Sequence, residues 1–200
     1  MTNETLVDLI RHGEPEGGRR YRGNGTDDPL SASGWDQMHQ ALDGQHPWDE
    51  IVTSPLTRCR AFAEMLAQRH DLPLTVEPDL CEVSLGEWEG LSPSEVRERD
   101  PQAYDDFYRD PVSCRPPGAE SLQDLISRVG RTYDNLVGKH VGQHLLLVVH
   151  AGVIRALIGR VLLAAPTRWY RVRIDYAGLM RIRHDRFGPV LEWVNVRRLP

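Results

Sequence analysis

The sequence predicts a three-layer α/β/α domain with a central, mostly parallel sheet. Two short apolar runs, Leu6–Ile10 and Leu145–Val149, each end at a histidine with a glycine close behind. Such runs are typical of buried strands that deliver a polar group to the edge of a sheet. Strand-like runs alternate with segments of helical periodicity. At 200 residues the chain is long enough for one domain, which we expect to cover residues 1–200.

Capping and turn residues divide the chain into elements. Ser31 and Pro55 are typical of helix starts, and Leu122, Leu125 and Val129 recur at helical spacing. Segment 16–28 is rich in Gly and Arg and is expected to be a mobile loop, too polar for the core. The last strands are expected to include an antiparallel pair. The predicted helices are 31–43, 56–69, 92–100, 102–110, 121–139 and 152–163, and the predicted strands are 6–10, 51–53, 74–76, 144–149, 171–176, 179–184 and 190–196.

Composition excludes several classes of function. The net charge is −5 and the basic residues are dispersed, so no nucleic-acid partner is expected. No apolar run approaches the roughly 20 residues of a membrane span, and no signal peptide is visible. The three widely spaced cysteines argue against a disulfide framework, and we therefore expect a cytoplasmic protein. A homodimer is left open.

Four short motifs place guanidinium, imidazole and carboxyl groups at predicted strand ends, helix starts and loops. They are Arg11-His12-Gly13, Ser54-Pro55-Leu56-Thr57-Arg58, Glu82–Gly90 with Trp88, and His150-Ala151-Gly152. Phosphoryl transfer needs a nucleophile in line with the leaving oxygen and donors on the equatorial oxygens. Arginine binds such oxygens bidentately, and a tight turn at Gly13 would bring N–H groups to the anion. The motifs together predict an anion site with a histidine nucleophile.

In order and spacing these motifs resemble the histidine phosphatase superfamily, with its phosphoglycerate mutase-like fold, from Leu6 to about Tyr176. The resemblance implies that His12 is the nucleophile and becomes phosphohistidine, and that Glu82 is the general acid. It also implies a phosphate pocket and a substrate site, formed by Arg11, Arg58 and His150 for the phosphate and by Arg22 and Gly23 for the rest of the substrate. We expect His150 to be protonated and no metal or cofactor to be needed.

Within the superfamily the chain is most similar to the alpha-ribazole phosphatases of cobalamin synthesis and related small phosphomonoesterases. The similar stretches are 29–31, 58–64, 116–122 and 152–157. The resemblance implies a small phosphate ester as substrate, with alpha-ribazole 5′-phosphate as one candidate. The alternatives are a cofactor-dependent phosphoglycerate mutase and a non-catalytic phosphate-binding module. The mutases have Asn-Glu-Arg-x-Tyr-Gly where this chain has Cys81–Gly86, and a lysine beyond that loop which is not found here.

Some residues depart from the family pattern or compete for a role. Gly18 stands where the family often has Asn, and Ala151 stands where a Gly is usual. Arg19, Arg20 and Arg22 could bind a second anionic group of the substrate. Glu87 and Glu89 are rivals of Glu82 as the acid. His140 and His144 are four residues apart, a spacing seen in metal sites, but a surface or core role is favoured for both.

Overall fold

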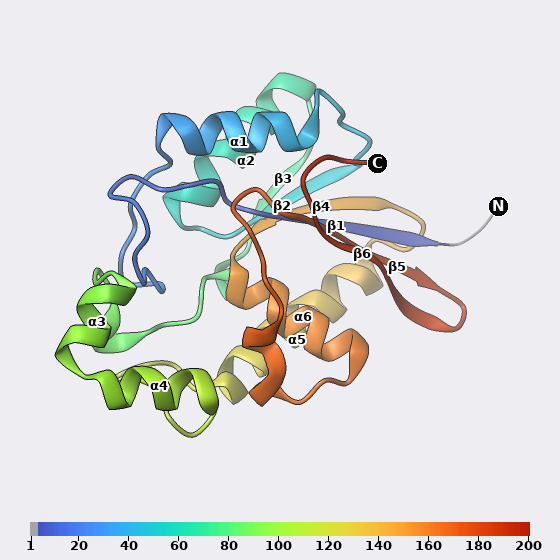
Figure 1. Ribbon diagram of the computed structural model, residues 1–200. Helices are drawn as coiled ribbons and strands as arrows, with labels where there is room; N and C mark the ends of the chain where they lie inside the picture. The colour runs from blue at the N-terminus through green and yellow to red at the C-terminus, as the bar shows by residue number, and fades with distance from the viewer. Residues whose placement is uncertain (1–3) are drawn as a thin grey trace.

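A six-stranded sheet in the order β3-β2-β4-β1-β5-β6 forms the centre of the computed structural model, which describes residues 4–200 (Figure 1). The pairings confirm the mostly parallel sheet, because β3, β2, β4 and β1 run parallel while the hairpin of β5 and β6 is antiparallel. The strands are β1 (Thr5–Arg11), β2 (Glu50–Thr53), β3 (Leu74–Val76), β4 (His144–Val149), β5 (Leu179–Asp185) and β6 (Gly188–Val196).

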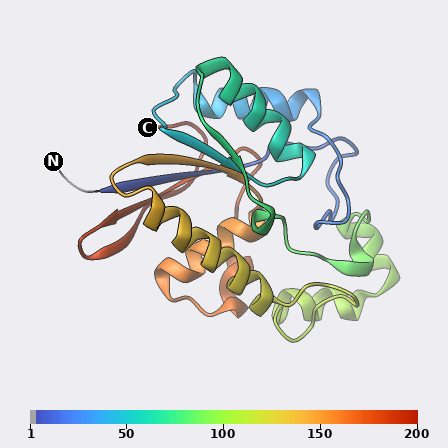
Figure 2. The ribbon, with the colours of Figure 1, turned by 180° about the vertical axis from the view of Figure 1, so that it is seen from behind.

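Helices cover both faces of this sheet, as Figures 1 and 2 show. One face packs on α1 (Ala32–Leu42) and α2 (Thr57–His70), and the other packs on α5 (Leu122–Lys139) and α6 (Ala151–Leu162). Among the described helices, none combines the length and apolar character needed to cross a membrane. Shorter helices complete the chain: η1 (Pro78–Leu80), η2 (Gly86–Trp88), α3 (Pro93–Arg99), α4 (Pro101–Arg109) and η3 (Pro166–Arg171).

Strand β4 shows why the two faces need different helices. Leu146 and Val148 belong to the core cluster under α1 and α2, whereas Leu145 and Leu147 belong to the cluster under α5 and α6. All four side chains have no exposed surface. Since successive side chains of a strand point to opposite faces, a continuous apolar run is buried only when both faces are covered.

A third apolar cluster lies beyond the sheet, at the carboxyl ends of its parallel strands. It joins Leu85 and Trp88 of the loop around η2 to Val96 of α3 and Phe107 of α4, with Tyr21 packed against it. Helices α3 and α4 stand apart from the sheet in Figure 1. This small cluster therefore forms a separate wall next to the edge of the sheet where the two histidines lie.

One prediction about local structure was wrong. Segment 171–176 is not a strand: its start belongs to η3, and the rest is irregular. Its carbonyl groups accept from arginine side chains instead of a neighbouring strand, Val172 from Arg155 and Ile174 from Arg11. Segment 16–28 is a loop, as predicted, and Arg22 within it is buried but belongs to none of the apolar core clusters. Polar groups can be buried there because they are hydrogen-bonded, as described below.

Candidate active site

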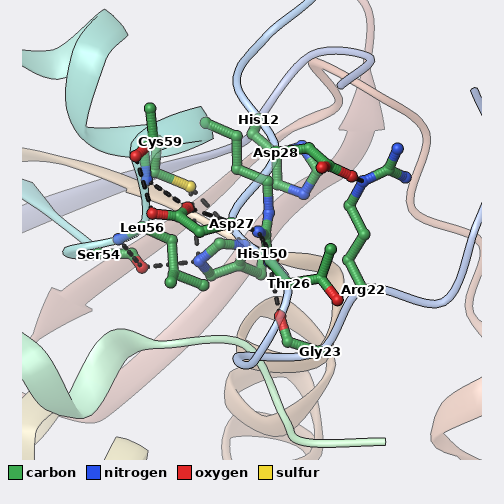
Figure 3. A network of polar contacts seen from close by, with 12 residues as sticks. His12, Arg22, Gly23, Thr26, Asp27, Asp28, Ser54, Leu56, Cys59 and His150 are labelled. Carbon is green, nitrogen blue, oxygen red and sulfur yellow. Dashed lines mark hydrogen bonds and ion pairs between the residues drawn. The ribbon is translucent and has the colours of Figure 1, made fainter. Parts of the chain in front are cut away.

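The pairing of β1 with β4 brings His12 and His150 together. Arg11 lies opposite Val149 in the parallel register, so the next residue of each strand leaves the sheet at the same level. The His12 N–H donates to the Val149 carbonyl at 3.0 Å, and the two imidazole centroids are 5.2 Å apart. Figure 3 shows the two rings side by side, and both are buried. The predicted meeting of two histidines at one sheet edge is therefore present in the structure.

The tautomer of His12 is set by its own loop. Its Nδ1 lies 2.7 Å from the Gly13 carbonyl oxygen, which can only accept, so Nδ1 holds the proton and Nε2 keeps its lone pair. Burial lowers the pKa of His12 well below its ordinary value, and the positive charges of Arg11 and Arg58 lower it further. His12 is thus a neutral imidazole with a free Nε2, the form required of a nucleophile.

Gly13 has a different role from the one that its sequence context suggested. A Cβ at this position would lie 2.1 Å from the carbonyl oxygen of Gly34 in α1. Its backbone φ is not in the left-handed region. The glycine is therefore needed for the close approach of the β1 end to the first turn of α1, which places the carbonyl that orients His12, and not for a tight turn.

Arg11 and Arg58 are fixed by backbone carbonyls. Arg11 donates from Nη1 to Ile174 at 2.7 Å and lies 4.2 Å above the centroid of the Tyr176 ring. Arg58 donates from its two Nη groups to the loop carbonyls of 23 and 26, at 2.7 and 2.8 Å. In both side chains Nε is buried without a hydrogen-bond partner among residues 4–200. An unmet buried donor costs about 1–3 kcal/mol, which a bound anion would offset.

His150 is held by residues that the sequence analysis did not assign to the site. Its Nε2 lies 2.7 Å from Ser54 Oγ and 3.5 Å from Cys59 Sγ (Figure 3). Burial lowers the pKa of His150 well below its ordinary value, and Arg58 adds to the effect. Both effects disfavour the imidazolium form of His150 in this structure, and its expected protonation opposite a bound phosphate stays a prediction. Ser54 is the first residue of the motif that contains Arg58, and this position in the sequence was the one indication that Ser54 belongs to the site.

Glu82 lies in the loop between η1 and η2, and its carboxyl group contacts the first turn of α6. Its Oε1 accepts from the backbone N–H of Val83 at 2.9 Å and from that of Gly152 at 3.0 Å. A Cβ on Gly152 would lie 2.2 Å from the same oxygen, so only glycine leaves room for this carboxyl group. Glu82 lines the cavity described below. In the sequence, Gly152 and Glu82 stand in separate motifs, and no pattern there connects them.

The rival carboxylate Glu89 has another function. It accepts from Ser84 Oγ and from the backbone N–H groups of Leu85 and Gly25, at 3.0, 2.9 and 2.8 Å. It thereby fastens the first loop to the loop before η2. Neither Glu89 nor Glu87 is among the residues that line the cavity. Of the three carboxylates, the structure places Glu82 in the cavity with His12.

The first loop is bound to α2 and to its own residues. Asp27 accepts from Thr57, through the backbone N–H at 2.7 Å and the hydroxyl at 2.8 Å, and so occupies the N-terminus of α2. Arg22 donates from Nε to Asp28 at 2.8 Å. Both Arg22 and Gly23 line the cavity. The guanidinium of Arg22 is paired, however, and the Gly23 carbonyl is used by Arg58.

These residues surround one cavity of about 770 Å³. That volume exceeds what a phosphate group alone would fill, so there is room for the rest of a substrate. The wall away from His12 is aromatic and includes Tyr21, Phe107, Tyr108 and Tyr170. Besides Arg11 and Arg58, the lining contains the arginines at 19, 20, 22, 155, 171 and 173. The cavity is therefore strongly cationic and suits an anionic ligand.

The histidines considered for a metal site are engaged elsewhere, at the other end of the sheet. His144 Nε2 donates to Asp8 at 2.8 Å, and His140 Nδ1 contacts Gln143 Oε1 at 2.7 Å. Asp8, which is fully buried, also accepts two hydrogen bonds from Arg181. Within residues 4–200, no three His, Cys, Asp or Glu side chains are grouped to hold a metal ion. These contacts favour a structural role for His140 and His144 over a metal site.

Comparison with known proteins gives matches over nearly the whole chain. Residues 7–197 match the family model described as histidine phosphatase superfamily (branch 1). Bifunctional protein Rv2228c of Mycobacterium tuberculosis is 35% identical over 88% of this chain, but this chain spans only about half (49%) of its length. The adenosylcobalamin/alpha-ribazole phosphatase of Salmonella typhimurium is 31% identical, with 84% of each chain covered. The alpha-ribazole phosphatase structure from Shigella flexneri superposes with a TM-score of 0.81, at 27% identity and 98% coverage of each chain.

Proposed function

We propose that this chain, which belongs to the histidine phosphatase superfamily (branch 1), is a phosphomonoesterase that acts through a phosphohistidine on His12. The observation that supports this most directly is the state of His12. Its Nδ1–H is bound to the Gly13 carbonyl, so a free Nε2 is left beside two arginines whose Nε donors lack partners among residues 4–200. A nucleophile beside unmet cationic donors suits a phosphate ester.

The residues have separate roles in the proposed reaction. Nε2 of His12 attacks phosphorus, the bond from phosphorus to the ester oxygen breaks, and Glu82 gives that oxygen its proton. Arg11, Arg58 and His150 stabilise the charge on the three equatorial oxygens. In the second half, Glu82 as carboxylate takes a proton from water, which attacks phosphorus and releases His12 and inorganic phosphate. The products are an alcohol and phosphate, and no metal is needed for this charge balance.

The substrate in this proposal is a small phosphate ester. Alpha-ribazole 5′-phosphate is one candidate, because relatives named alpha-ribazole phosphatase match most of the chain. We further propose that residues 1–200 belong to a single histidine phosphatase domain. Cytoplasmic localisation and a homodimer stay predictions.

The test is trapping of the phosphoenzyme. Wild-type protein mixed with ³²P-labelled ester and quenched without acid should give a label on protein that is acid-labile and alkali-stable. His12→Ala should lose both the label and steady-state phosphate release, while His39→Ala, a variant of an exposed histidine, should keep them. Substantial turnover in folded His12→Ala would refute the mechanism. Interconversion of 2- and 3-phosphoglycerate without release of inorganic phosphate, at a rate comparable to ester hydrolysis, would instead support the mutase alternative.

A further inference from the structure

We propose that Arg155 forms a second anion subsite beside the phosphate pocket, so that the preferred substrate has a carboxylate or a second phosphate on its leaving group. This inference rests on the proposed phosphatase function and narrows its substrate class. It differs from the sequence-based expectation, which placed a second anion at Arg19, Arg20 and Arg22.

Arg155 is held rigidly at the wall of the cavity. It lies in α6, almost one turn beyond Gly152, and it lines the cavity. Its Nε donates to the Val172 carbonyl at 3.0 Å, and its guanidinium carbon lies 5.1 Å above the Tyr170 ring centroid. Neither Nη group has a hydrogen-bond partner among residues 4–200, and no carboxylate there forms an ion pair with it. Its Nη donors are therefore available to a ligand.

The same segment of chain holds the phosphate-pocket Arg11 in the same manner. Arg11 donates to the Ile174 carbonyl and lies over the Tyr176 ring, whereas Arg155 donates to the carbonyl two residues earlier and lies over the ring of Tyr170. Two guanidinium groups are thus each fixed by one carbonyl and one aromatic ring of segment 170–176. Residues 171–176 were predicted as a strand, and the carbonyls at 172 and 174, which are free of strand pairing, make the arrangement possible.

The spacing of the two arginines limits the size of the ligand. Two residues of chain span at most about 7 Å, so the two carbonyls that hold the guanidinium groups are no further apart than that. Burial is the main cause that lowers the pKa of Arg11, and the positive charge of Arg155 contributes to the same shift. Two nearby cations repel each other, and an anion at each reduces that cost. A second anionic group a few bonds from the ester oxygen would reach Arg155.

The other arginines of the cavity are less suited to this role. Arg20 donates to the carbonyls of residues 17 and 90, Arg22 is paired with Asp28, and Arg173 is paired with Asp175. Arg19 and Arg171 are exposed, and within residues 4–200 neither has a hydrogen bond that fixes its guanidinium. A fixed guanidinium loses less conformational entropy on binding than a mobile one. Arg155 therefore combines a fixed position with free donors.

The experiment compares matched esters. 3-Phosphoglycerate and glycerol 1-phosphate share a three-carbon skeleton and differ by a carboxylate, and glycerol 1,3-bisphosphate offers a phosphate in its place. Wild-type kcat/KM should be at least about 10-fold higher for either 3-phosphoglycerate or glycerol 1,3-bisphosphate than for glycerol 1-phosphate. That factor is expected for one charge-assisted hydrogen bond to the second anionic group. The substrate that gains identifies the second anion as carboxylate or phosphate.

The variants test whether Arg155 is the cause. Arg155→Gln should reduce that kcat/KM ratio to near one, and Arg155→Lys should restore part of it. Arg160→Gln is the matched control, since Arg160 is in the same helix but outside the cavity and pairs with Asp134. An unchanged ratio in Arg155→Gln, or an equal loss on all three esters, would overturn the subsite. If wild-type protein hydrolyses no ester at all, the proposed function itself fails.

Discussion

Replacement of Gly152 by alanine should separate general-acid catalysis from phosphoryl transfer. Gly152 lies in the first turn of α6, and its backbone is compatible with alanine, because its φ is not positive. The new Cβ, however, would lie 2.2 Å from Oε1 of Glu82 and 3.0 Å from Cγ1 of Val83. Non-bonded heavy atoms are at their optimum near 3.5–4.0 Å, so the carboxyl group must move by about 1 Å or more. The three atoms nearest to that Cβ all belong to Glu82 and Val83, and none belongs to His12 or to a pocket arginine.

The size of the effect follows from this displacement. A misplacement of about 1 Å in a catalytic group costs about 10²-fold, and general acids contribute about 10²–10⁴-fold. A sugar or alkyl phosphate, whose alkoxide needs a proton in order to leave, should therefore lose about 10²-fold in kcat/KM. p-Nitrophenyl phosphate, whose leaving group departs unaided, should lose only a few-fold.

The assay is steady-state kcat/KM for both esters with Gly152→Ala, Glu82→Gln and the double variant. Glu82→Gln should show the same dependence on the leaving group, and the double variant should lose little more than Glu82→Gln alone, because both changes act on one group. Gly138→Ala in α5 is the control, since its Cβ would meet nothing within 4 Å. Equal losses on both esters, or the leaving-group dependence appearing in Glu87→Gln or Glu89→Gln, would show that Glu82 is not the acid.

Three further predictions concern the phosphate pocket. Ser54→Ala should lower kcat about 10-fold and reduce stability by about 1–3 kcal/mol, because Nε2 of buried His150 loses its closer partner at 2.7 Å and keeps only the weaker contact with Cys59; rescue by Ser54→Thr in kinetics and urea unfolding would support the assignment. The free energy of unfolding should fall as pH is lowered from about 7 to 5, by up to about 2.7 kcal/mol per unit. In this range the unfolded chain binds protons on both histidines, whereas the folded chain, in which the pKa values of His12 and His150 are lowered, does not; His150→Asn should reduce the slope, and an unchanged slope would contradict this. Prolonged EDTA treatment should leave turnover unchanged, and vanadate should inhibit. Loss of activity with EDTA that one specific metal restores would contradict the proposal that side chains alone balance the charge of the phosphate.

The sequence by itself determined the sheet and the place of its reactive edge. The apolar runs before His12 and His150 are buried because both faces of a parallel sheet are covered, so their periodicity already indicated two central strands. Parallel strands end at the same edge, and this puts the two histidines in one site. The place of Arg58 in the site was predictable because this residue comes after β2, at the start of a helix. These predictions hold because they depend on local pattern and strand direction.

Tertiary structure decided which polar groups meet. Residues 171–176 were predicted as a strand, yet the carbonyls of this segment accept from Arg11 and Arg155, which come from β1 and α6. The sequence indicated Gly152 and Glu82 as separate motifs, and only packing of α6 against the loop puts the carboxyl group where a Cβ would be. Side-chain hydrogen bonds between distant segments depend on the position and direction of both partners. Residue pattern alone does not specify those positions, because they are set by how the helices and loops pack around the sheet.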